Sequence, residues 1–213
     1  MIKKVTTKDG STSFFSEKYQ ETYHSISCAK QEAREKFVRP CNLKDGAKIL
    51  DICFGLGYKT AAALEFAEHL EITGVEIDRE ILKKIQEIES DLPYYESIKK
   101  LAVSKDFKYR NERCSIIITL DDARVFVKQL QKTHPAYFDA VFLDPFSPKA
   151  CPELWTEEFF KDIFICMKPH GVLTTYSCAR IVRDNLRKVG FTVKDGPCIG
   201  RRAPSTTAVK ENK

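Results

Sequence analysis

Three acidic side chains stand at or just after the ends of apolar segments, where a carboxylate can hold a ligand. They are Asp51, Glu76 and Asp122. A carboxylate accepts hydrogen bonds from ribose hydroxyls or from an adenine amino group, and it attracts cations. Each acid alone could equally cap a helix. Three acids placed alike, with a glycine turn after the first, predict a site for a nucleotide-like cofactor.

The glycine turn, with Gly55 and Gly57, joins the segment that carries Asp51 to a stretch typical of a helix. Glycines let the backbone approach a ligand closely, and open α/β sheets bind ligands at the carboxyl ends of their strands. A dinucleotide fingerprint would have a small residue where Thr60 stands. A carboxylate as near as Asp51 would repel a pyrophosphate, whereas it would attract the sulfonium and ammonium groups of S-adenosylmethionine. The pattern favours S-adenosylmethionine, although Glu76 suits both ligands.

Asp144 is the candidate for the chemistry itself. It is followed by Pro145, Phe146 and a second proline at 148, which predict a rigid, exposed turn at the cofactor edge. Methyl transfer needs a nucleophile with a free lone pair, aligned opposite the sulfonium. An amine substrate must first be neutral, and Asp144 can orient it and accept its proton directly or through water. Trp155, the one tryptophan, either packs a helix against the sheet or contributes to the substrate pocket.

These side chains need a framework of strands and helices to bring them together. Short apolar runs, suited to strands buried on both faces, alternate with amphipathic stretches, which predicts a doubly wound, Rossmann-like α/β sheet. The expected strands are 48–53, 71–76, 114–119, 138–143 and 172–176. The expected helices are 59–69, 79–90, 94–103, 123–132, 157–167 and 179–189.

Both ends of the chain depart from this alternation. Residues 191–194 and 206–210 read as an antiparallel hairpin that finishes the sheet. Residues 5–15 contain Asp9-Gly10, the signal of a type I′ turn, and predict a small N-terminal hairpin, which a helix over 28–38 follows. We therefore expect two parts, an extension of hairpin and helix over 1–40 and a cofactor-binding domain over 41–213.

The amino-acid composition of the chain limits which classes of function the protein can have. The chain has 213 residues, 43% of them hydrophobic, and a net charge of +5, which permits an anionic partner such as nucleic acid without requiring one. The 8 cysteines include no Cys-x-x-Cys pair, so we expect reduced, mostly buried thiols and no metal. No stretch is long and apolar enough for a membrane span, and the start lacks a secretory pattern, which predicts a cytoplasmic protein.

The motifs resemble those of class I S-adenosylmethionine-dependent methyltransferases. Asp51, Gly55, Gly57, Glu76 and the pair Asp122-Ala123 correspond to successive cofactor-binding motifs of that class. A closer resemblance, to the methyltransferase domain of the MnmC family of tRNA wobble-uridine enzymes, covers about residues 10–209. It rests above all on 139–148, 152–156, 176–179 and 200–202.

The MnmC resemblance implies a substrate. It implies methylation of the aminomethyl nitrogen on carbon 5 of a wobble uridine, with or without sulfur at carbon 2, and places Asp144 beside the transferred methyl. The flavin-dependent oxidase half of that family has no counterpart in this sequence, so no flavin is expected. Pro145 stands where the bifunctional family has glycine, and Cys28 also replaces a glycine.

The tRNA anticodon stem-loop is then the expected partner. Arg201 and Arg202 are candidates for phosphate contacts, with a solvated surface as the alternative. Tyr23, His24 and Phe146 are candidates for holding the flipped uracil, with a structural role as the alternative for His24.

Two other enzymes and one non-enzyme remain open as alternatives. The first is an aminopropyltransferase of the spermidine synthase type, disfavoured because Tyr58-Lys59 stands where that family has an acid. The second is a methyltransferase for another amine. A non-catalytic RNA-binding protein would not need Asp51, Glu76 and Asp144 together.

Overall fold

The computed structural model describes residues 1–200 and 202–212 and contains a central eight-stranded sheet. Its strand order is β10-β11-β9-β8-β4-β5-β7-β6. The strands are β4 (Lys48–Ile52), β5 (Leu70–Glu76), β6 (Lys108–Arg110), β7 (Cys114–Leu120), β8 (Phe138–Leu143), β9 (Met167–Thr175), β10 (Thr192–Asp195) and β11 (Thr206–Val209). β9, β8, β4, β5 and β7 are parallel, which confirms the doubly wound, Rossmann-like α/β sheet.

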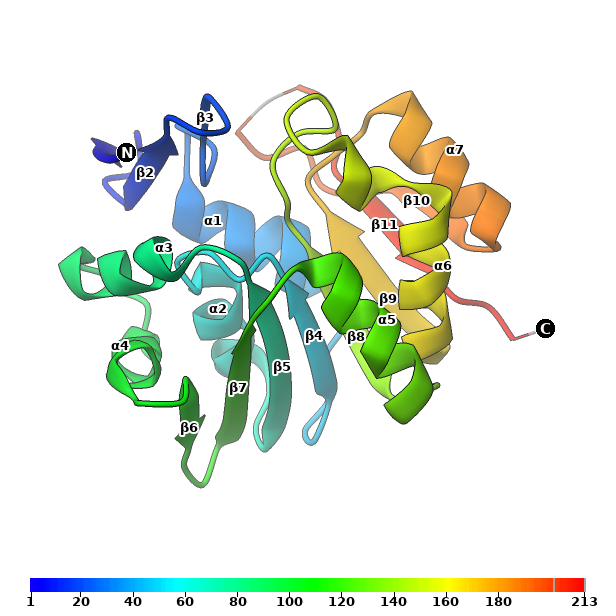
Figure 1. The fold of residues 1–213 in the computed structure, drawn as a ribbon, viewed down its shortest axis with the longest axis horizontal. Helices are drawn as coiled ribbons and strands as arrows, with labels where there is room; N and C mark the ends of the chain where they lie inside the picture. Colours follow the sequence, from blue (N-terminus) through cyan, green and yellow to red (C-terminus); the bar gives the residue numbers. More distant parts are fainter. Residues whose placement is uncertain (201, 213) are drawn as a thin grey trace.

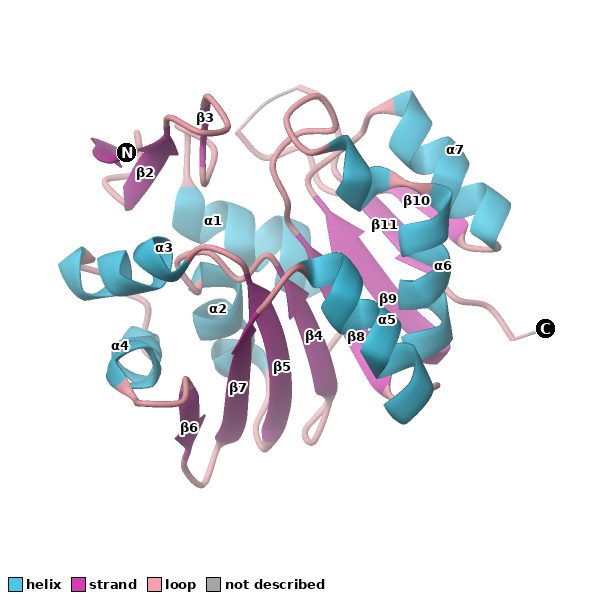
Figure 2. Cartoon of the chain, viewed as in Figure 1, coloured by secondary structure: helices cyan, strands magenta, loops and turns pink. Residues whose placement is uncertain are grey.

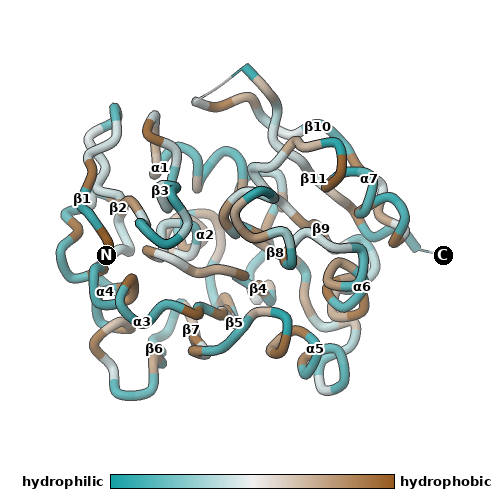
Figure 3. Tube along the Cα trace, turned by 45° about the horizontal axis from the view of Figure 1, so that its top comes forward, coloured by the Kyte–Doolittle hydropathy of each residue, from teal (hydrophilic) through white to brown (hydrophobic). Residues whose placement is uncertain are grey.

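Helices cover both faces of this sheet (Figures 1 and 2). One face carries α5 (Ala123–Thr133), α6 (Glu157–Cys166) and α7 (Arg180–Val189). The other carries α1 (Ala29–Glu32), α2 (Tyr58–Phe66), α3 (Arg79–Lys84) and α4 (Tyr95–Val103). Apolar and polar segments alternate along α5 and α6 in Figure 3, as expected of helices with one face on the sheet. Each layer has its own buried hydrophobic cluster.

The sheet reverses its winding between β4 and β8, which are neighbours although three other strands separate them in the chain. Ligands of open α/β sheets bind at such a switch point. The helices α2, α3 and α5 all begin there, after β4, β5 and β7, and Asp78 and Asp122 cap α3 and α5 by accepting from backbone N–H groups. The candidate carboxylates therefore meet at one edge.

The two edges of the sheet differ in how well the sequence predicts them. The C-terminal antiparallel hairpin is confirmed: β10 pairs with β11, which pairs antiparallel with β9. At the other edge β6 pairs antiparallel with β7 and was not predicted, since its three residues are mostly exposed and carry no apolar alternation.

The N-terminal segment forms three strands where the sequence predicts two. β1 (Ile2–Thr6), β2 (Thr12–Ser16) and β3 (Glu21–Thr22) make a separate antiparallel sheet. The expected type I′ turn is wrong, because the Thr7 N–H bonds the Ser11 carbonyl at 2.9 Å around a longer loop. The helix expected over 28–38 begins as α1, continues as a π-helix over Ala33–Val38 and ends in a 3₁₀ turn over Arg39–Cys41.

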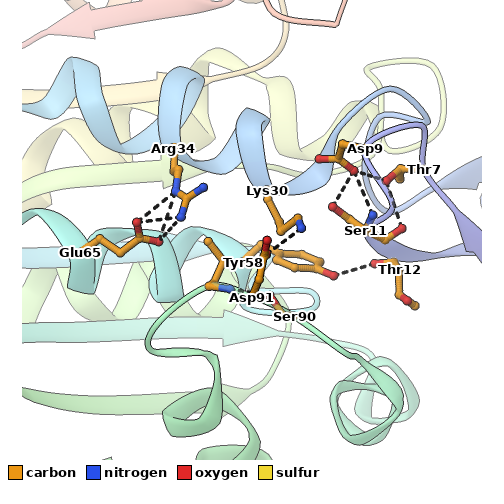
Figure 4. Close-up of polar contacts among 11 residues, drawn as sticks. Thr7, Asp9, Ser11, Thr12, Lys30, Arg34, Tyr58, Glu65, Ser90 and Asp91 are labelled. Carbon is orange, nitrogen blue, oxygen red and sulfur yellow. Dashed lines mark hydrogen bonds and ion pairs between the residues drawn. The ribbon is translucent and has the colours of Figure 1, made fainter.

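Side chains fasten this segment to the rest of the molecule (Figure 4). The Tyr58 hydroxyl donates to the Thr12 carbonyl at 2.8 Å. Arg34 and Glu65 form a two-pronged ion pair, with Nη2 2.9 Å from Oε2. Phe37 and Val38 belong to the same buried cluster as α2. The division at residue 40 stays a prediction.

Two other sequence expectations bear on the described part of the chain. No helix within residues 1–200 and 202–212 is both long and apolar enough to cross a membrane. All 8 cysteines are free thiols, of which Cys28, Cys114, Cys151 and Cys166 are buried, whereas Cys41, Cys53 and Cys178 are partly buried and Cys198 is exposed, so the expectation of mostly buried thiols holds for half of them.

Candidate active site

A cavity of about 530 Å³ opens at the carboxyl ends of β4, β5, β7 and β8. Its floor comes from the loops after these strands, and its roof comes from residues of the N-terminal segment around β3. Of the predicted residues, the cavity is lined by Tyr23, His24, Gly55, Glu76, Asp122, Ala123, Asp144 and Phe146. Asp51, Gly57 and Trp155 do not line it.

Glu76 presents a fixed carboxylate to this cavity. Its Oε2 accepts from the Gly55 N–H at 2.8 Å, and its Oε1 accepts from the N–H groups of Ile77 and Asp78 at 2.9 Å each. Burial raises its pKa above the ordinary value, against the effect of these bonds. Gly55 adopts φ +61°, the left-handed region in which glycine carries no steric penalty. The turn and the carboxylate thus hold each other in place.

Asp122 combines a helix cap with an ion pair at the next strand end. Its Oδ1 accepts from the Arg124 N–H at 2.8 Å, and Arg124 Nη2 lies 2.6 Å from Oδ2. The hydrogen bond from the Arg124 side chain lowers the pKa of Asp122. This acid is therefore ionised at neutral pH.

Asp51 and Gly57 lie beneath the cavity. The Asp51 side chain is 0% exposed, its Oδ2 accepts from the Thr60 hydroxyl at 2.9 Å, and its Oδ1 lies 3.5 Å from Lys59 Nζ. The φ angle of Gly57 is +75°, and a Cβ atom at this position would lie only 2.5 Å from Ile98 Cγ2. Packing and backbone conformation thus explain this glycine. The sequence predicts that Asp51 attracts the cofactor cation directly. In the structure Asp51 is fully buried next to Lys59, so it can influence a bound cation only indirectly, through Lys59.

Asp144 and Lys59 form the charged centre of the cavity. Lys59 Nζ is 3.0 Å from Asp144 Oδ2, with Lys59 2% and Asp144 12% exposed. Burial raises the pKa of Asp144 to about 7, which Lys59 opposes and Glu32 reinforces. Burial works against the charge of Lys59, but the negative charges of Asp144 and Asp51 outweigh it and raise the pKa of its ammonium. The lysine stays cationic, and Asp144 titrates near neutral pH.

The loop after Asp144 is held from below. The Trp155 indole N–H donates to the Phe146 carbonyl at 2.9 Å, and the Tyr176 hydroxyl donates to the Pro145 carbonyl at 3.0 Å. Trp155 is buried and packs edge-on against Phe160 and Tyr176. Trp155 therefore supports this loop by packing and by one hydrogen bond.

The roof is tied to the same loop and to the loop after β5. Glu21 accepts from the Ser147 backbone N–H at 2.9 Å and from its hydroxyl. The Tyr23 hydroxyl donates to Asp78 Oδ2 at 3.1 Å. Tyr19 stacks on Phe146 with ring centroids 4.4 Å apart, and Tyr23 meets the same ring edge-on at 5.0 Å. An aromatic wall thus stands beside Asp144.

His24 is a buried, neutral part of this roof. Its Nδ1 lies 3.2 Å from the Ser13 hydroxyl, and its ring meets Tyr58 edge-on at 5.1 Å. Burial lowers its pKa to about 3.

The predicted phosphate-binding arginines are placed only in part. Arg202 is exposed, in the loop between β10 and β11, and Arg201 lies outside the described residues. This loop touches the N-terminal segment, since the Ser27 hydroxyl donates to the Gly200 carbonyl at 3.1 Å. Arg202 thus stands in the part of the chain that borders the roof.

Sequence reasoning missed several residues of the site. They are Lys59, Glu21, Glu32, Tyr19 and Asp78. Lys59 could have been identified from the sequence. It lies in the first turn of a helix and is followed by Thr-Ala-Ala-Ala, and a charged side chain among small buried residues needs a partner of opposite charge. The contacts of Glu21 and Tyr19 join segments more than a hundred residues apart and left no such signal. Within the described chain, no three His, Cys, Asp or Glu side chains are grouped so as to hold a metal ion.

Comparisons with known proteins agree with this geometry. Residues 83–211 match the family of S-adenosyl-L-methionine-dependent methyltransferases. An uncharacterized protein of Methanocaldococcus jannaschii is 34% identical over 97% of this chain and 59% of its own length. The tRNA 5-methylaminomethyl-2-thiouridine biosynthesis bifunctional protein MnmC of Leptospira interrogans is 24% identical over 88% of this chain and 32% of its own length. The chain therefore spans less than two thirds of these curated relatives.

Solved structures extend the likeness to the fold. The crystal structure of MnmC2 from Aquifex aeolicus has a TM-score of 0.83 and 34% identity, covering 98% of this chain and 70% of that one. Spermidine synthase from Thermotoga maritima has a TM-score of 0.59 and 16% identity, covering 94% of this chain and 68% of that one. The second likeness concerns the fold alone.

Proposed function

Because the chain belongs to the S-adenosyl-L-methionine-dependent methyltransferases, we propose that it methylates the aminomethyl nitrogen of a 5-aminomethyluridine at the wobble position of tRNA. The uridine carries oxygen or sulfur at carbon 2. The observation that carries the proposal is Asp144, a carboxylate of raised pKa that shares one cavity with the acceptor groups Glu76 and Asp122. The names of the MnmC relatives support the choice of tRNA as substrate.

The side chains of the cavity fit the proposed cofactor. Glu76 is buried and has both oxygens fixed by backbone donors, so its remaining lone pairs suit the two ribose hydroxyls. Asp122 and Ala123 begin α5 at the cavity edge, where Asp122 can accept from an adenine amino group. Acceptor-only groups match a ligand rich in donors and positive charge, so these residues with Gly55 would hold it.

The chemistry at Asp144 follows from its protonation state. When bound, S-adenosylmethionine supplies an electrophilic methyl group, and its sulfur leaves as a thioether with the electrons of the broken C–S bond. An ammonium cannot attack a methyl group because it has no lone pair. The Asp144 carboxylate accepts a proton from the substrate ammonium, and the freed nitrogen lone pair forms the new N–C bond. Further rate acceleration comes from holding the amine nitrogen in line with the methyl group, which lowers the entropic cost of bringing the two reactants together.

The roof and its neighbouring loop suit a nucleic-acid substrate. Phe146 and Tyr23 offer rings for a flipped uracil in the cavity that Asp144 lines, and neutral His24 lines the same cavity. Arg202, with Arg201, holds phosphates of the anticodon stem-loop. Such a substrate places the reaction in the cytoplasm.

Labelled methyl transfer tests the proposal. The protein is incubated with methyl-labelled S-adenosylmethionine and tRNA that carries 5-aminomethyluridine, and the nucleosides are separated after digestion. We expect label in 5-methylaminomethyluridine or its 2-thio form, and none in tRNA with an unmodified wobble uridine. Absence of label from a protein shown to bind the cofactor would reject the proposal.

Aminopropyl transfer to a polyamine is a second candidate, favoured by the carboxylates Glu21, Glu32, Asp78 and Glu153 that also line the cavity. Polyamines are polycations, which such a lining attracts. Aminopropyl transfer from decarboxylated S-adenosylmethionine to putrescine, without methylation of tRNA, would establish this activity instead.

A further inference from the structure

Lys59 is a buried cation that the mechanism above leaves without a function. Its ammonium lies 3.0 Å from Asp144 Oδ2, 3.5 Å from Asp51 Oδ1 and 3.1 Å from the Cys53 carbonyl. The ammonium donates hydrogen bonds to Asp144 Oδ2 and the Cys53 carbonyl, and Asp51 Oδ1 lies within ion-pair distance without a hydrogen bond. The lysine therefore has a fixed position.

The lysine also couples the cavity to the sheet. Asp51 lies within β4 and is held by the Thr60 hydroxyl, so the order of contact is Thr60, Asp51, Lys59 and Asp144. Lys59 and Asp144 line the cavity, whereas Thr60 and Asp51 do not. Asp144 Oδ2 is bound to Lys59, whereas Asp144 Oδ1 has no hydrogen bond within the described part of the chain.

We propose that Lys59 is the positioning residue of methyl transfer, which favours the ionised form of Asp144 and orients it so that Oδ1 can accept the proton of the substrate ammonium. The inference rests on the proposed function, since it presupposes that Asp144 receives that proton. Lys59 itself contacts neither substrate nor reacting atoms in this role.

The charges around Asp144 show why a cation is needed. From β4 it faces Asp51 and, just beyond the strand, Cys53; from α1 it faces Glu32; and from the end of β9 it faces Tyr176. Glu32 forms an ion pair with Lys36 at 2.5 Å but still raises the pKa of Asp144. Two carboxylates so close and so buried resist being ionised together. Without Lys59, Asp51 and Asp144 would share one negative charge, and Asp144 would hold a proton at neutral pH.

The alternative that Lys59 is the proton acceptor does not fit its surroundings. A general base must be neutral before it accepts a proton. Asp144 and Asp51 raise the pKa of Lys59, so its ammonium keeps its protons across the neutral range.

The test compares Lys59→Met, which keeps the length of the side chain, with Lys59→Arg, which keeps its charge. Single-turnover methyl transfer is measured from about pH 6 to pH 9.5. We expect Lys59→Met to move the acid limb of the profile upward by at least about one pH unit, so that the rate falls by at least about fivefold at pH 7, by about tenfold at pH 6, and recovers at high pH. Lys59→Arg should stay near the wild-type profile, and cofactor affinity should change little in both.

A second measurement follows Asp144 without any substrate. The protein is labelled with ¹³C at aspartate carboxyls, and the Asp144 resonance is identified by its loss in Asp144→Asn. Its titration should move upward in Lys59→Met. It should move downward in Asp51→Asn, which removes the competing carboxylate and also serves if Lys59→Met does not fold.

The outcomes separate the inference from the proposed function. If wild-type protein methylates no tRNA, the proposed function fails, and the carboxyl titrations still decide whether Lys59 controls Asp144. An unmoved titration in both Lys59→Met and Asp51→Asn would overturn the inference. So would a loss of cofactor binding in Lys59→Met with an unmoved titration, because Lys59 would then be a cofactor ligand.

Discussion

At the scale of single residues, Asp144 combines burial with a carboxylate oxygen that has no hydrogen bond among the described residues, and removing the carboxylate should separate catalysis from binding. We expect Asp144→Asn to bind S-adenosylmethionine normally and to lose about 10²- to 10⁴-fold in kcat, the usual share of a general base. Calorimetry and single-turnover assays measure the two effects. Glu158→Gln, an exposed acid on α6, is the control. Unchanged turnover in Asp144→Asn would remove Asp144 from the mechanism.

His24 should make the protein sensitive to acid. Its pKa is about 3 in the fold because of burial, against an ordinary value of 6.5, so between these values only the unfolded chain binds the proton. The free energy of unfolding should therefore fall by about 1.4 kcal/mol per pH unit from this residue as the pH drops from 6.5 toward 3. Asp51 and Asp144, whose pKa values are raised by burial to about 6 and about 7, act in the opposite direction.

Denaturant titrations of wild-type protein and His24→Gln at several pH values isolate this contribution. The difference between the two free energies should change with pH in favour of the variant as the solution becomes acidic. Parallel pH profiles would show that His24 is protonated in the folded protein.

At the scale of elements, the loop between β8 and α6 depends on Trp155 for its shape. Trp155→Phe keeps an aromatic side chain, although a smaller one, and removes the indole N–H that donates to the Phe146 carbonyl; loss of this hydrogen bond alone costs about 1 kcal/mol. For a domain of this size that lowers Tm by about 2–4 °C. We expect kcat to fall as well, with cofactor affinity unchanged, because the loop carries Asp144.

Phe159→Leu provides the matched comparison, since it alters a buried ring on α6 with a similar loss of stability. The thermal melts of the two variants should be alike and only Trp155→Phe should lose turnover. Equal loss of turnover in both would show that general destabilisation, and not the loop, is responsible.

The elements also show how far sequence reasoning reaches. Strands such as β4 and β8 were placed to within a residue, because central parallel strands are apolar on both faces. The edge strand β6 and the two-residue strand β3 were not predicted from the sequence. Short exposed strands become extended because they pair with a neighbouring strand, and this pairing leaves no pattern in their own residues. The same reasoning predicted Glu76 at a strand end and Asp144 just after one, and the structure places both in the cavity. It did not single out Lys59 on α2, whose contacts are with Asp51 of β4 and with Asp144 after β8.

At the scale of the whole molecule, negative charge lies inside the cavity while the chain as a whole carries +5. A cationic cofactor and amine suit the interior, and an RNA backbone suits the outside. The association of tRNA should accordingly weaken as salt rises, because phosphates release counterions when basic side chains neutralise them.

Arg202 tests where on the surface this contact is made. If it neutralises a phosphate, Arg202→Ala should weaken tRNA binding and reduce the slope of log Kd against log salt by about 1. Lys132→Ala is the control, because Lys132 is exposed in the last turn of α5, whose first turn borders the cavity. An 11-residue helix separates its ends by about 16 Å, so the control should leave the slope unchanged. Equal slopes for wild type and Arg202→Ala would show that the β10–β11 loop is a solvated surface and that tRNA approaches the cavity from another side.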